Sequence, residues 1–337
     1  MTHSTHSTSS GQAGSGQAPN HPKIGSAQTG TGTVVRIGTR GSALAVAQTQ
    51  TIASSLAAKT GVVIEVVTVR TEGDTSTESL ASLGGTGVFA GALREALIAG
   101  RVDVVVHSLK DLPTAAYPGL SIGAVPKRVD ARDALCARDG LTMDDLPAGA
   151  RVGTGSPRRA AQLRARRPDV EVVDIRGNVD TRLAHVAEGR LDAVVLAAAG
   201  LDRLGRLGAV TEFLSLDGWP SAPGQGALAL EVRVGEEKLV SALNHNPTRT
   251  IVEAERHVLA LLEAGCAAPI GAHGQIDDGL LFLDARVYSP DGTEKLTSSH
   301  ALYISDTLHP ALEVAERVAT ELLDNGAATF APVGGTA

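Results

Sequence analysis

The sequence predicts an α/β protein with mainly parallel sheets, followed by a smaller module of another kind. Two observations carry this prediction. Short β-branched runs such as Val102–Val106 alternate with helical patterns along residues 34–204, as in chains that build parallel sheets. After Pro247 one long helical pattern and two extended runs follow without that alternation, which indicates a small α+β module. At 337 residues, two or three domains are expected.

The expected elements begin and end at recognisable signals. Ser42 can cap one helix, Gly61 can end it, and Ser156 with Pro157 opens another. The expected helices are 43–59, 88–99, 157–167, 179–188, 248–264 and 308–325. The expected strands are Val34–Ile37, Val62–Val69, Val102–Val106, Arg151–Gly153, Val170–Ile175, Leu191–Leu196, Leu280–Tyr288 and Ala301–Ser305. Ser221–Gly226 interrupts the pattern and is expected to be a hinge or crossover.

The start of the chain and the cysteine content indicate a cytoplasmic protein. Residues 1–32 are mostly Ser, Thr, Gly, Gln and His, which predicts a disordered tail without the apolar core of a secretory signal. No apolar run approaches the roughly 20 residues of a membrane helix. Cys136 and Cys266 make no disulfide framework, and no Cys or His pair has metal-ligand spacing. We therefore expect no membrane association and no metal.

The charge distribution points to a small anionic ligand. The formal net charge is −7, yet 24 of the 30 basic residues are arginines, whose planar guanidinium binds carboxylates in a bidentate way. Residues 151–206 hold 11 arginines against 7 acidic residues. Nucleic acid is a poorer explanation, because aromatic residues make up only 2% of the chain and leave few rings for base stacking.

Polar residues follow several predicted strands directly. Ligands of open α/β sheets bind at the carboxyl ends of strands, and helix N-termini there favour anions. The residues in such positions are Arg40, Ser42, Lys110, Asp111, Ser156, Arg158, Arg159 and Arg176. Four loops of this kind predict one anion-binding site. Gly153–Ser156 lacks the third glycine of a dinucleotide motif, and Ser156 lacks a nucleophile elbow.

Cys266 stands on a turn after the long helical pattern, between Gly265 and Pro269. A lone cysteine is by default a small buried hydrophobic residue. The alternative is a thiol held on a rigid turn so that a group can be attached to it. The stretch alone does not choose between them.

Seven motifs together resemble the porphobilinogen deaminases, also called hydroxymethylbilane synthases. The resemblance runs in order from about Val34 to the last helix. The motifs are Arg36–Ser42, His107–Pro113, Gly153–Arg159, Arg176–Val179 with Thr181 and Arg182, Ala199–Leu204, Gly224–Ala227 and Gly265 with Cys266.

The resemblance implies three domains and a transferase of haem (tetrapyrrole) biosynthesis. Two doubly wound domains like type II periplasmic binding proteins would enclose a cleft, and a small α+β domain would carry the cysteine. The implied boundaries are 1–32 for the tail, 33–127 with 223–245 for domain 1, 128–222 for domain 2 and 246–337 for domain 3. The implied enzyme is a cytoplasmic monomer that binds no nucleic acid. It joins four porphobilinogens head to tail onto a dipyrromethane cofactor, releases ammonia, and frees hydroxymethylbilane by hydrolysis.

The resemblance also implies residue roles. Cys266 would attach the dipyrromethane through a thioether, and Asp111 would be the catalytic residue. The cofactor carboxylates would be bound by Ser108, Lys110, Thr154, Ser156, Arg158 and Arg159. The substrate or its neighbouring ring would be bound by Arg40, Ser42, Gln48, Arg176, Arg182 and Arg203.

One loop departs from the family pattern. Residues 84–91 read GGTGVFAG, where the family commonly has a lysine after the two glycines and another polar residue after the phenylalanine. The missing basic residues bear on loop closure and not on the chemistry. One alternative is a non-catalytic two-lobed anion-binding protein, which would need neither Cys266 nor Asp111. A second is a regulator that binds nucleic acid through residues 151–206.

Overall fold

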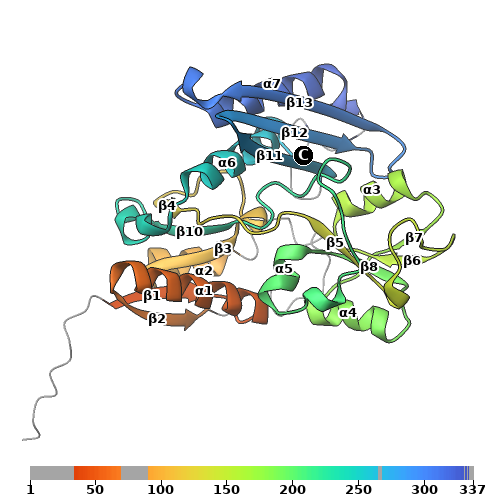
Figure 1. The fold of residues 1–337 in the computed structure, drawn as a ribbon. Coiled ribbons are helices and arrows are strands. Elements are labelled where there is room, and N and C mark those ends of the chain that lie inside the picture. Colours follow the sequence, from red (N-terminus) through yellow and green to blue (C-terminus); the bar gives the residue numbers. More distant parts are fainter. Residues whose placement is uncertain (1–33, 70–89, 265–267, 330, 332, 334–337) are drawn as a thin grey trace, which may run out of the picture. The chain divides into compact units, whose positions relative to one another are not determined.

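The computed structural model describes residues 34–69, 90–264, 268–329, 331 and 333, which form three β-sheets and their packed helices (Figure 1). The expected α/β class is confirmed. The predicted N-terminal tail lies outside the described residues. Within the described ranges, no helix is both long and apolar enough to cross a membrane.

The α-helices are α1 (Ala43–Thr60), α2 (Gly91–Ile98), α3 (Pro157–Arg166), α4 (Val179–Ala187), α5 (Ala198–Arg203), α6 (Asn246–Leu261) and α7 (Pro310–Asp324). The strands are β1 (Val34–Thr39), β2 (Val63–Thr68), β3 (Val104–Ser108), β4 (Leu120–Ala124), β5 (Asp133–Ala137), β6 (Arg151–Gly153), β7 (Glu171–Val173), β8 (Ala193–Ala197), β9 (Glu212–Phe213), β10 (Leu228–Arg233), β11 (Ile270–Asp277), β12 (Leu280–Tyr288) and β13 (Lys295–Tyr303).

The first sheet has the strand order β2-β1-β3-β10-β4. β1 pairs in parallel with β2 and β3, whereas β10 runs antiparallel between β3 and β4. Successive residues of a strand point to opposite faces, so Val104 and Val106 pack with Ile52 of α1 while Val105 packs with Leu93 of α2. The two helices therefore cover opposite faces of this sheet.

The second sheet repeats this arrangement in the order β7-β6-β8-β5-β9. β6 pairs in parallel with β7 and β8, and β5 lies antiparallel beside β8. Val195 packs with Leu163 of α3 on one face, and Val194 packs with Leu183 of α4 on the other. Both sheets are thus doubly wound.

The antiparallel strand of each sheet comes from a crossing segment. Along the chain, β5 of the second sheet precedes β6, β7 and β8, and β10 of the first sheet follows all strands of the second. The chain therefore crosses between the sheets twice, at residues 125–132 and 214–227. Ser221–Gly226, expected to be a hinge or crossover, lies in the second of these crossings.

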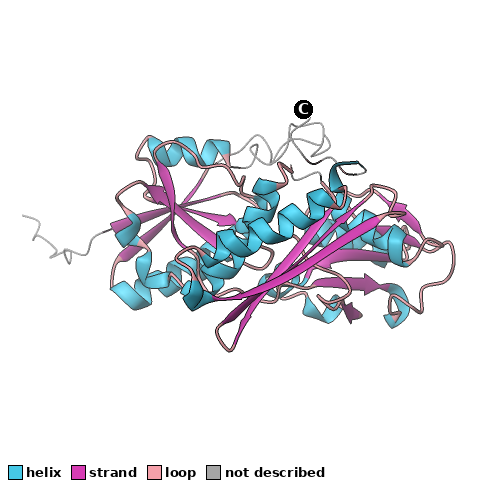
Figure 2. Cartoon of the chain, turned by 90° about the horizontal axis from the view of Figure 1, so that it is seen from above, coloured by secondary structure: helices cyan, strands magenta, loops and turns pink. Residues whose placement is uncertain are grey.

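The third sheet is antiparallel, in the order β11-β12-β13, and Figure 2 gives a second view of these strands. Alternate residues of β12, Leu281 and Leu283 among them, pack against Val258 of α6 and Val314 of α7. This is the α+β module that the sequence predicted after Pro247.

The structure corrects several element boundaries. The third strand of the last sheet spans Lys295–Tyr303 and not Ala301–Ser305. The long helix ends at Leu261, three residues before its expected end, and Glu263 takes a left-handed conformation with φ 47°. Helix α2 begins at Gly91; the expected start at Val88 lies outside the described residues.

Candidate functional site

The loop after β3 brings Lys110 and Asp111 to the carboxyl end of the first sheet. Both belong to a short 3-10 turn, Leu109–Asp111, whose Leu109 is buried and fixes the turn against the sheet. The Lys110 Nζ donates to Gln225 Oε1 at 3.2 Å, whereas the Asp111 residue is exposed. Ser108 at the end of the strand meets Gln48 of α1, whose Nε2 lies 2.9 Å from the serine Oγ.

The N-terminus of α3 brings a second set of predicted residues to the second sheet. Ser156 caps the helix, because its Oγ accepts a hydrogen bond from the Arg159 backbone N–H at 3.5 Å. Thr154 is buried, and its Oγ1 accepts from the Ser156 N–H at 3.2 Å. Arg158 and Arg159 are buried, with 4% and 6% of their surfaces exposed. They are therefore not solvated surface residues of α3.

Asp133, the first residue of β5, joins the two arginines. It has no exposed surface, and its carboxylate accepts from Arg158 Nη2 at 2.8 Å and from Arg159 Nη2 at 2.6 Å. Trp219 Nε1 and Gln225 Nε2 also donate to it, each at 2.8 Å. Burial alone would raise the pKa of Asp133, but the two guanidinium groups and the hydrogen bonds from Arg159 and Gln225 hold it well below its usual range. Asp133 is therefore ionised.

Sequence reasoning missed Asp133. The residue opens an apolar strand of the second sheet, and only the antiparallel pairing of β5 with β8 brings it beside α3. The available signal was an acidic residue at the start of the run Asp133–Ala137, since a buried carboxylate requires a cationic partner.

We call Lys110, Arg158, Arg159 and Asp133 the cationic cluster. With Lys110 protonated it carries two net positive charges. Burial, together with Arg159 and Arg158, lowers the pKa of Lys110 to about 8 against the opposing effects of Asp111 and Asp133. Arg158 Nε is a buried donor without a hydrogen-bond partner among the described residues. The cluster thus has charge and one donor left over for an anionic ligand.

Arg182 on α4 is in electrostatic reach of the cationic cluster. Its Nε donates to the Gly177 carbonyl at 2.9 Å. Burial, followed by the repulsion of Arg159 and Arg176, lowers the pKa of Arg182 to about 10, while Asp111 acts in the opposite direction. Asp111 therefore has cationic neighbours from both sheets.

The other predicted residues occupy the expected loops and helix ends. Arg40 lies between β1 and α1, and the Ser42 Oγ is engaged in capping α1. Arg176 lies 3.8 Å from Asp174, and Arg203 Nη2 donates to the Gly226 carbonyl in the second crossing at 2.9 Å. That contact with the crossing was not expected from the helix-like pattern around Arg203.

Two predicted features cannot be placed. Cys266 and most of the loop 84–91 lie outside the described residues. Helix α6, which precedes Cys266 in the sequence, ends at Leu261. No group of three or more metal-ligating side chains occurs among the residues that the structure places.

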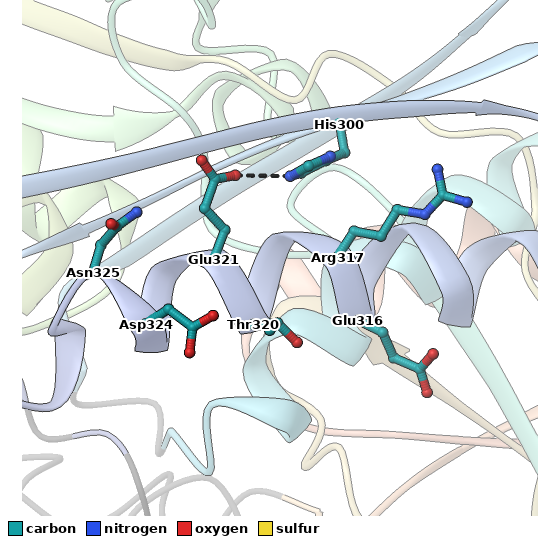
Figure 3. Close-up of a pocket in the computed structure, with 7 residues that line it drawn as sticks. All are labelled: His300, Glu316, Arg317, Thr320, Glu321, Asp324 and Asn325. Atoms are coloured by element: carbon teal, nitrogen blue, oxygen red, sulfur yellow. Dashed lines mark hydrogen bonds and ion pairs between the residues drawn. The ribbon is translucent and has the colours of Figure 1, made fainter.

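A surface hollow of about 660 Å³ lies elsewhere, between β13 and α7 (Figure 3). Its polar wall includes His300, whose Nε2 lies 2.7 Å from the Glu321 carboxylate, together with Glu316 and Arg317. None of the predicted site residues lines it, and it is open to solvent. The chemistry expected of the strand-end loops does not involve it.

Two family models match the chain. Residues 35–241 match the porphobilinogen deaminase dipyrromethane cofactor binding domain, and residues 250–324 match the porphobilinogen deaminase C-terminal domain. A porphobilinogen deaminase of Leifsonia xyli subsp. xyli is 63% identical over 314 residues, which cover 89% of this chain and 95% of that protein. One of Thermobifida fusca is 50% identical over 303 residues, covering 88% and 95%.

Solved structures give weaker likenesses. The methionine binding protein MetQ matches with a TM-score of 0.41 and 12% identity over 64% of this chain and 92% of its own. The periplasmic VFT2 domain of Bordetella pertussis BvgS matches with a TM-score of 0.38 and 20% identity over 63% and 85%. At these values the likeness says nothing about function.

Proposed function

Because this chain belongs to the porphobilinogen deaminase family, we propose that its cationic cluster binds the carboxylates of a dipyrromethane cofactor and that Asp111 acts beside it. The enzyme joins four porphobilinogen molecules head to tail, releases one ammonia for each, and frees hydroxymethylbilane by hydrolysis. Neither a non-catalytic binding protein nor a nucleic-acid regulator is favoured by these matches.

The cationic cluster is the observation that carries the proposal. Each pyrrole ring of the cofactor and substrate bears one acetate and one propionate, so the ligand is densely anionic. Two net positive charges at the carboxyl ends of strands suit such a ligand, because charge-assisted hydrogen bonds to carboxylates are among the strongest in proteins. The unpartnered Arg158 Nε offers one such bond.

The residues proposed to hold the cofactor are Ser108, Lys110, Thr154, Ser156, Arg158 and Arg159. When bound, the dipyrromethane supplies the pyrrole α-carbon to which the first porphobilinogen is joined. Because Asp133 fixes both guanidinium groups from the inside, Arg158 and Arg159 are oriented before the ligand arrives. Such preorganisation lowers the entropic cost of binding.

Asp111 is the proposed catalytic residue. Loss of ammonia from porphobilinogen leaves a methylene-pyrrole cation whose charge is shared by the ring nitrogen. An exposed carboxylate beside the bound rings stabilises that charge as it develops and accepts hydrogen bonds from pyrrole N–H groups. Arg182 binds the carboxylates of the incoming substrate and Lys110 binds those of the cofactor, so the reacting rings are held beside the Asp111 carboxylate.

Six residues, Arg182 among them, are proposed to bind the incoming substrate or its neighbouring ring. Arg40, Ser42, Gln48, Arg176, Arg182 and Arg203 come from α1, α4, α5 and the loops before them. Gln48 is tied to Ser108 by its 2.9 Å hydrogen bond, which joins the proposed substrate and cofactor residues of the first sheet.

The proposed attachment point is Cys266, through a thioether. The test is the intact mass of protein purified from cells that make pyrroles: it should exceed the sequence mass by one dipyrromethane, and Cys266→Ala should remove the excess. Cys136→Ser is the matched control, because burial raises the pKa of the Cys136 thiol to about 12 and keeps it unreactive. An unmodified wild-type mass, or an excess that survives Cys266→Ala, would contradict the attachment.

The proposal includes a monomeric enzyme in the cytoplasm. Sedimentation at several protein concentrations measures the first point, and fractionation of the source cells measures the second. The domain boundaries at residues 127, 222 and 245 also stay predictions, for which limited proteolysis is the direct measurement.

A further inference from the structure

Gln225, in the second crossing segment, is the residue that touches both halves of the cationic cluster. Its side chain is buried, with 1% of the residue exposed. The Oε1 accepts from Lys110 Nζ at 3.2 Å, on the first sheet, and from Arg159 Nη2 at 3.3 Å, on the second. The Nε2 donates to the Ala131 carbonyl and to Asp133 Oδ1, each at 2.8 Å.

The orientation of this amide is fixed by its neighbours. Its oxygen faces two cationic donors, and its nitrogen faces only acceptors, so a flipped amide would meet like partners on both sides. The backbone is fixed as well, because Arg128 Nε donates to the Gln225 carbonyl at 2.6 Å, and the Arg128 guanidinium binds Glu255 of α6. A buried amide with all its partners satisfied is a rigid spacer.

We propose that Gln225 is a positioning residue that holds Lys110 and Arg159 at one spacing, so that the cationic cluster fits the carboxylates of the bound cofactor. This role rests on the function proposed above. A glutamine suits the position because it is neutral: its oxygen attracts both cations without adding a charge beside Asp133. A shorter asparagine would not span the same partners.

The pH dependence of the Lys110 amine gives a readout that a general loss of structure would not produce. The groups acting on this amine are Asp111 on its own turn, Arg158 and Arg159 on α3, and Asp133 on β5. Gln225→Glu places a negative charge beside Lys110 and should move its titration to higher pH, by about one pH unit. Gln225→Met removes the acceptor and should move it to lower pH.

The experiment is competitive labelling of the lysines with trace acetic anhydride between pH 6 and 11, with the Lys110 peptide measured by mass spectrometry. All chains carry Cys266→Ala, so that no attached cofactor covers the amine. Gln275→Glu, the same change at an exposed glutamine of β11, should leave the Lys110 midpoint unchanged. The exposed Lys238 and Lys295 should titrate alike in every chain.

Opposite movements of the Lys110 midpoint in the two variants support the proposal. Movement in the same direction, or none, overturns it. With Cys266 restored, Gln225→Met should lower the fraction of molecules that carry the dipyrromethane mass at least several-fold, while Gln275→Glu keeps it; full occupancy in Gln225→Met would also overturn it. If wild-type protein carries no excess mass, the proposed function fails, and the labelling still decides whether Gln225 holds Lys110.

Discussion

Asp111 stands third in a 3-10 turn that directly follows a strand, and the chain repeats this arrangement at Asp306, in the turn Ile304–Asp306 after β13. Both residues are exposed. Asp111 differs in having the cationic neighbours Lys110 and Arg182, as their pKa values reflect. If Asp111 were needed only for its turn, its substitution would have the same effect as substitution of Asp306. Asp306 is therefore the matched control for Asp111.

Asp111→Asn should lower kcat by at least about 100-fold, because it removes the charge aimed at the cation that develops in the reaction. Shape and hydrogen bonding are kept, so the protein should remain folded and should hold the dipyrromethane when supplied with preformed tetrapyrrole. Steady-state turnover and intact mass measure both effects. Asp306→Asn should change neither. Turnover of Asp111→Asn within a few-fold of wild type would refute a catalytic role.

Arg158→Leu should both destabilise the protein and prevent cofactor binding. Asp133 has no exposed surface, and loss of one of its two guanidinium partners should cost about 3–5 kcal/mol of the free energy of unfolding. Urea titration and intact mass measure the two effects. Arg166→Leu on the same helix is the control: its exposed pair with Asp144 should contribute at most about 1 kcal/mol.

Arg182→Leu separates cofactor binding from elongation. This arginine contacts the Gly177 carbonyl and none of the residues that bind Asp133, so its loss should leave the dipyrromethane mass in place and stop turnover. Arg158→Leu with full cofactor, or Arg182→Leu without any, would refute this division of roles.

At the residue scale, sequence reasoning placed the basic side chains at the strand ends and missed the residues that hold them there. Strand-end positions follow from local patterns, so Lys110, Arg158 and Arg159 were predicted. The inner partner Asp133 and the bridging Gln225 depend on strand pairing and on a crossing segment, which no local pattern specifies. The placement of these two residues is a tertiary property of the chain.

At the element scale, helix α3 packs against the turn between β12 and β13. Arg164 Nη1 donates to the Pro290 carbonyl at 2.8 Å. Gly292 in this turn has φ +79°, and a Cβ there would lie 2.6 Å from the Ala161 carbonyl oxygen of α3. The third sheet thus supports the helix whose first turn carries Arg158 and Arg159.

Gly292→Ala should therefore lower the free energy of unfolding by more than the cost of placing an alanine in a left-handed backbone conformation. Gly279, in the turn between β11 and β12, has φ +78°, and a Cβ added there would meet no atom within 4 Å. Gly279→Ala thus measures the conformational cost alone, about 1–2 kcal/mol. Collision with α3 should add about 1–3 kcal/mol for Gly292→Ala. Equal free energies of unfolding for the two variants would show that the turn does not brace α3.

Sequence patterns predicted α1, α3 and α4 of the two doubly wound sheets well, but they missed the short helix α5 and several of the strands. Helix α1 is marked by the cap Ser42 at its start and by Gly61 at its end, and α3 is marked by Ser156 with Pro157. β9 has two residues, and β5 and β10 are short runs beside crossings, so their sheet membership is decided by pairing partners far along the chain.

At the scale of the whole molecule, Glu255 of α6 ties the two crossings to the third sheet. Its buried carboxylate accepts from Arg128 Nη1 in the first crossing at 2.6 Å. It accepts from the Gly224 N–H in the second crossing at 2.7 Å and from the Gly274 N–H of β11 at 2.9 Å. Segments more than 100 residues apart thus share one charged partner, which a reading of local sequence does not reveal.

Glu255→Gln should loosen this connection while keeping side-chain size. The amide keeps one oxygen acceptor but leaves the Arg128 guanidinium without its ion partner, at a cost of about 3–5 kcal/mol. Because Trp219, the single tryptophan, lies in the second crossing and reports on the surroundings of Asp133, its fluorescence can be compared with far-UV circular dichroism during urea unfolding. The two transitions should coincide in the wild type and separate in Glu255→Gln.

The control for this experiment lies two residues earlier on the same helix. Glu253 forms an exposed i,i+4 pair with Arg249, and such pairs contribute about 0.3–0.5 kcal/mol. Glu253→Gln should therefore leave both transitions at nearly the wild-type urea concentration. If Glu255→Gln unfolds in one transition at the same urea concentration as Glu253→Gln, the Glu255 carboxylate does not couple the crossings to the third sheet. The Arg128 side chain would then support Gln225 only through its own hydrogen bond to the Gln225 carbonyl.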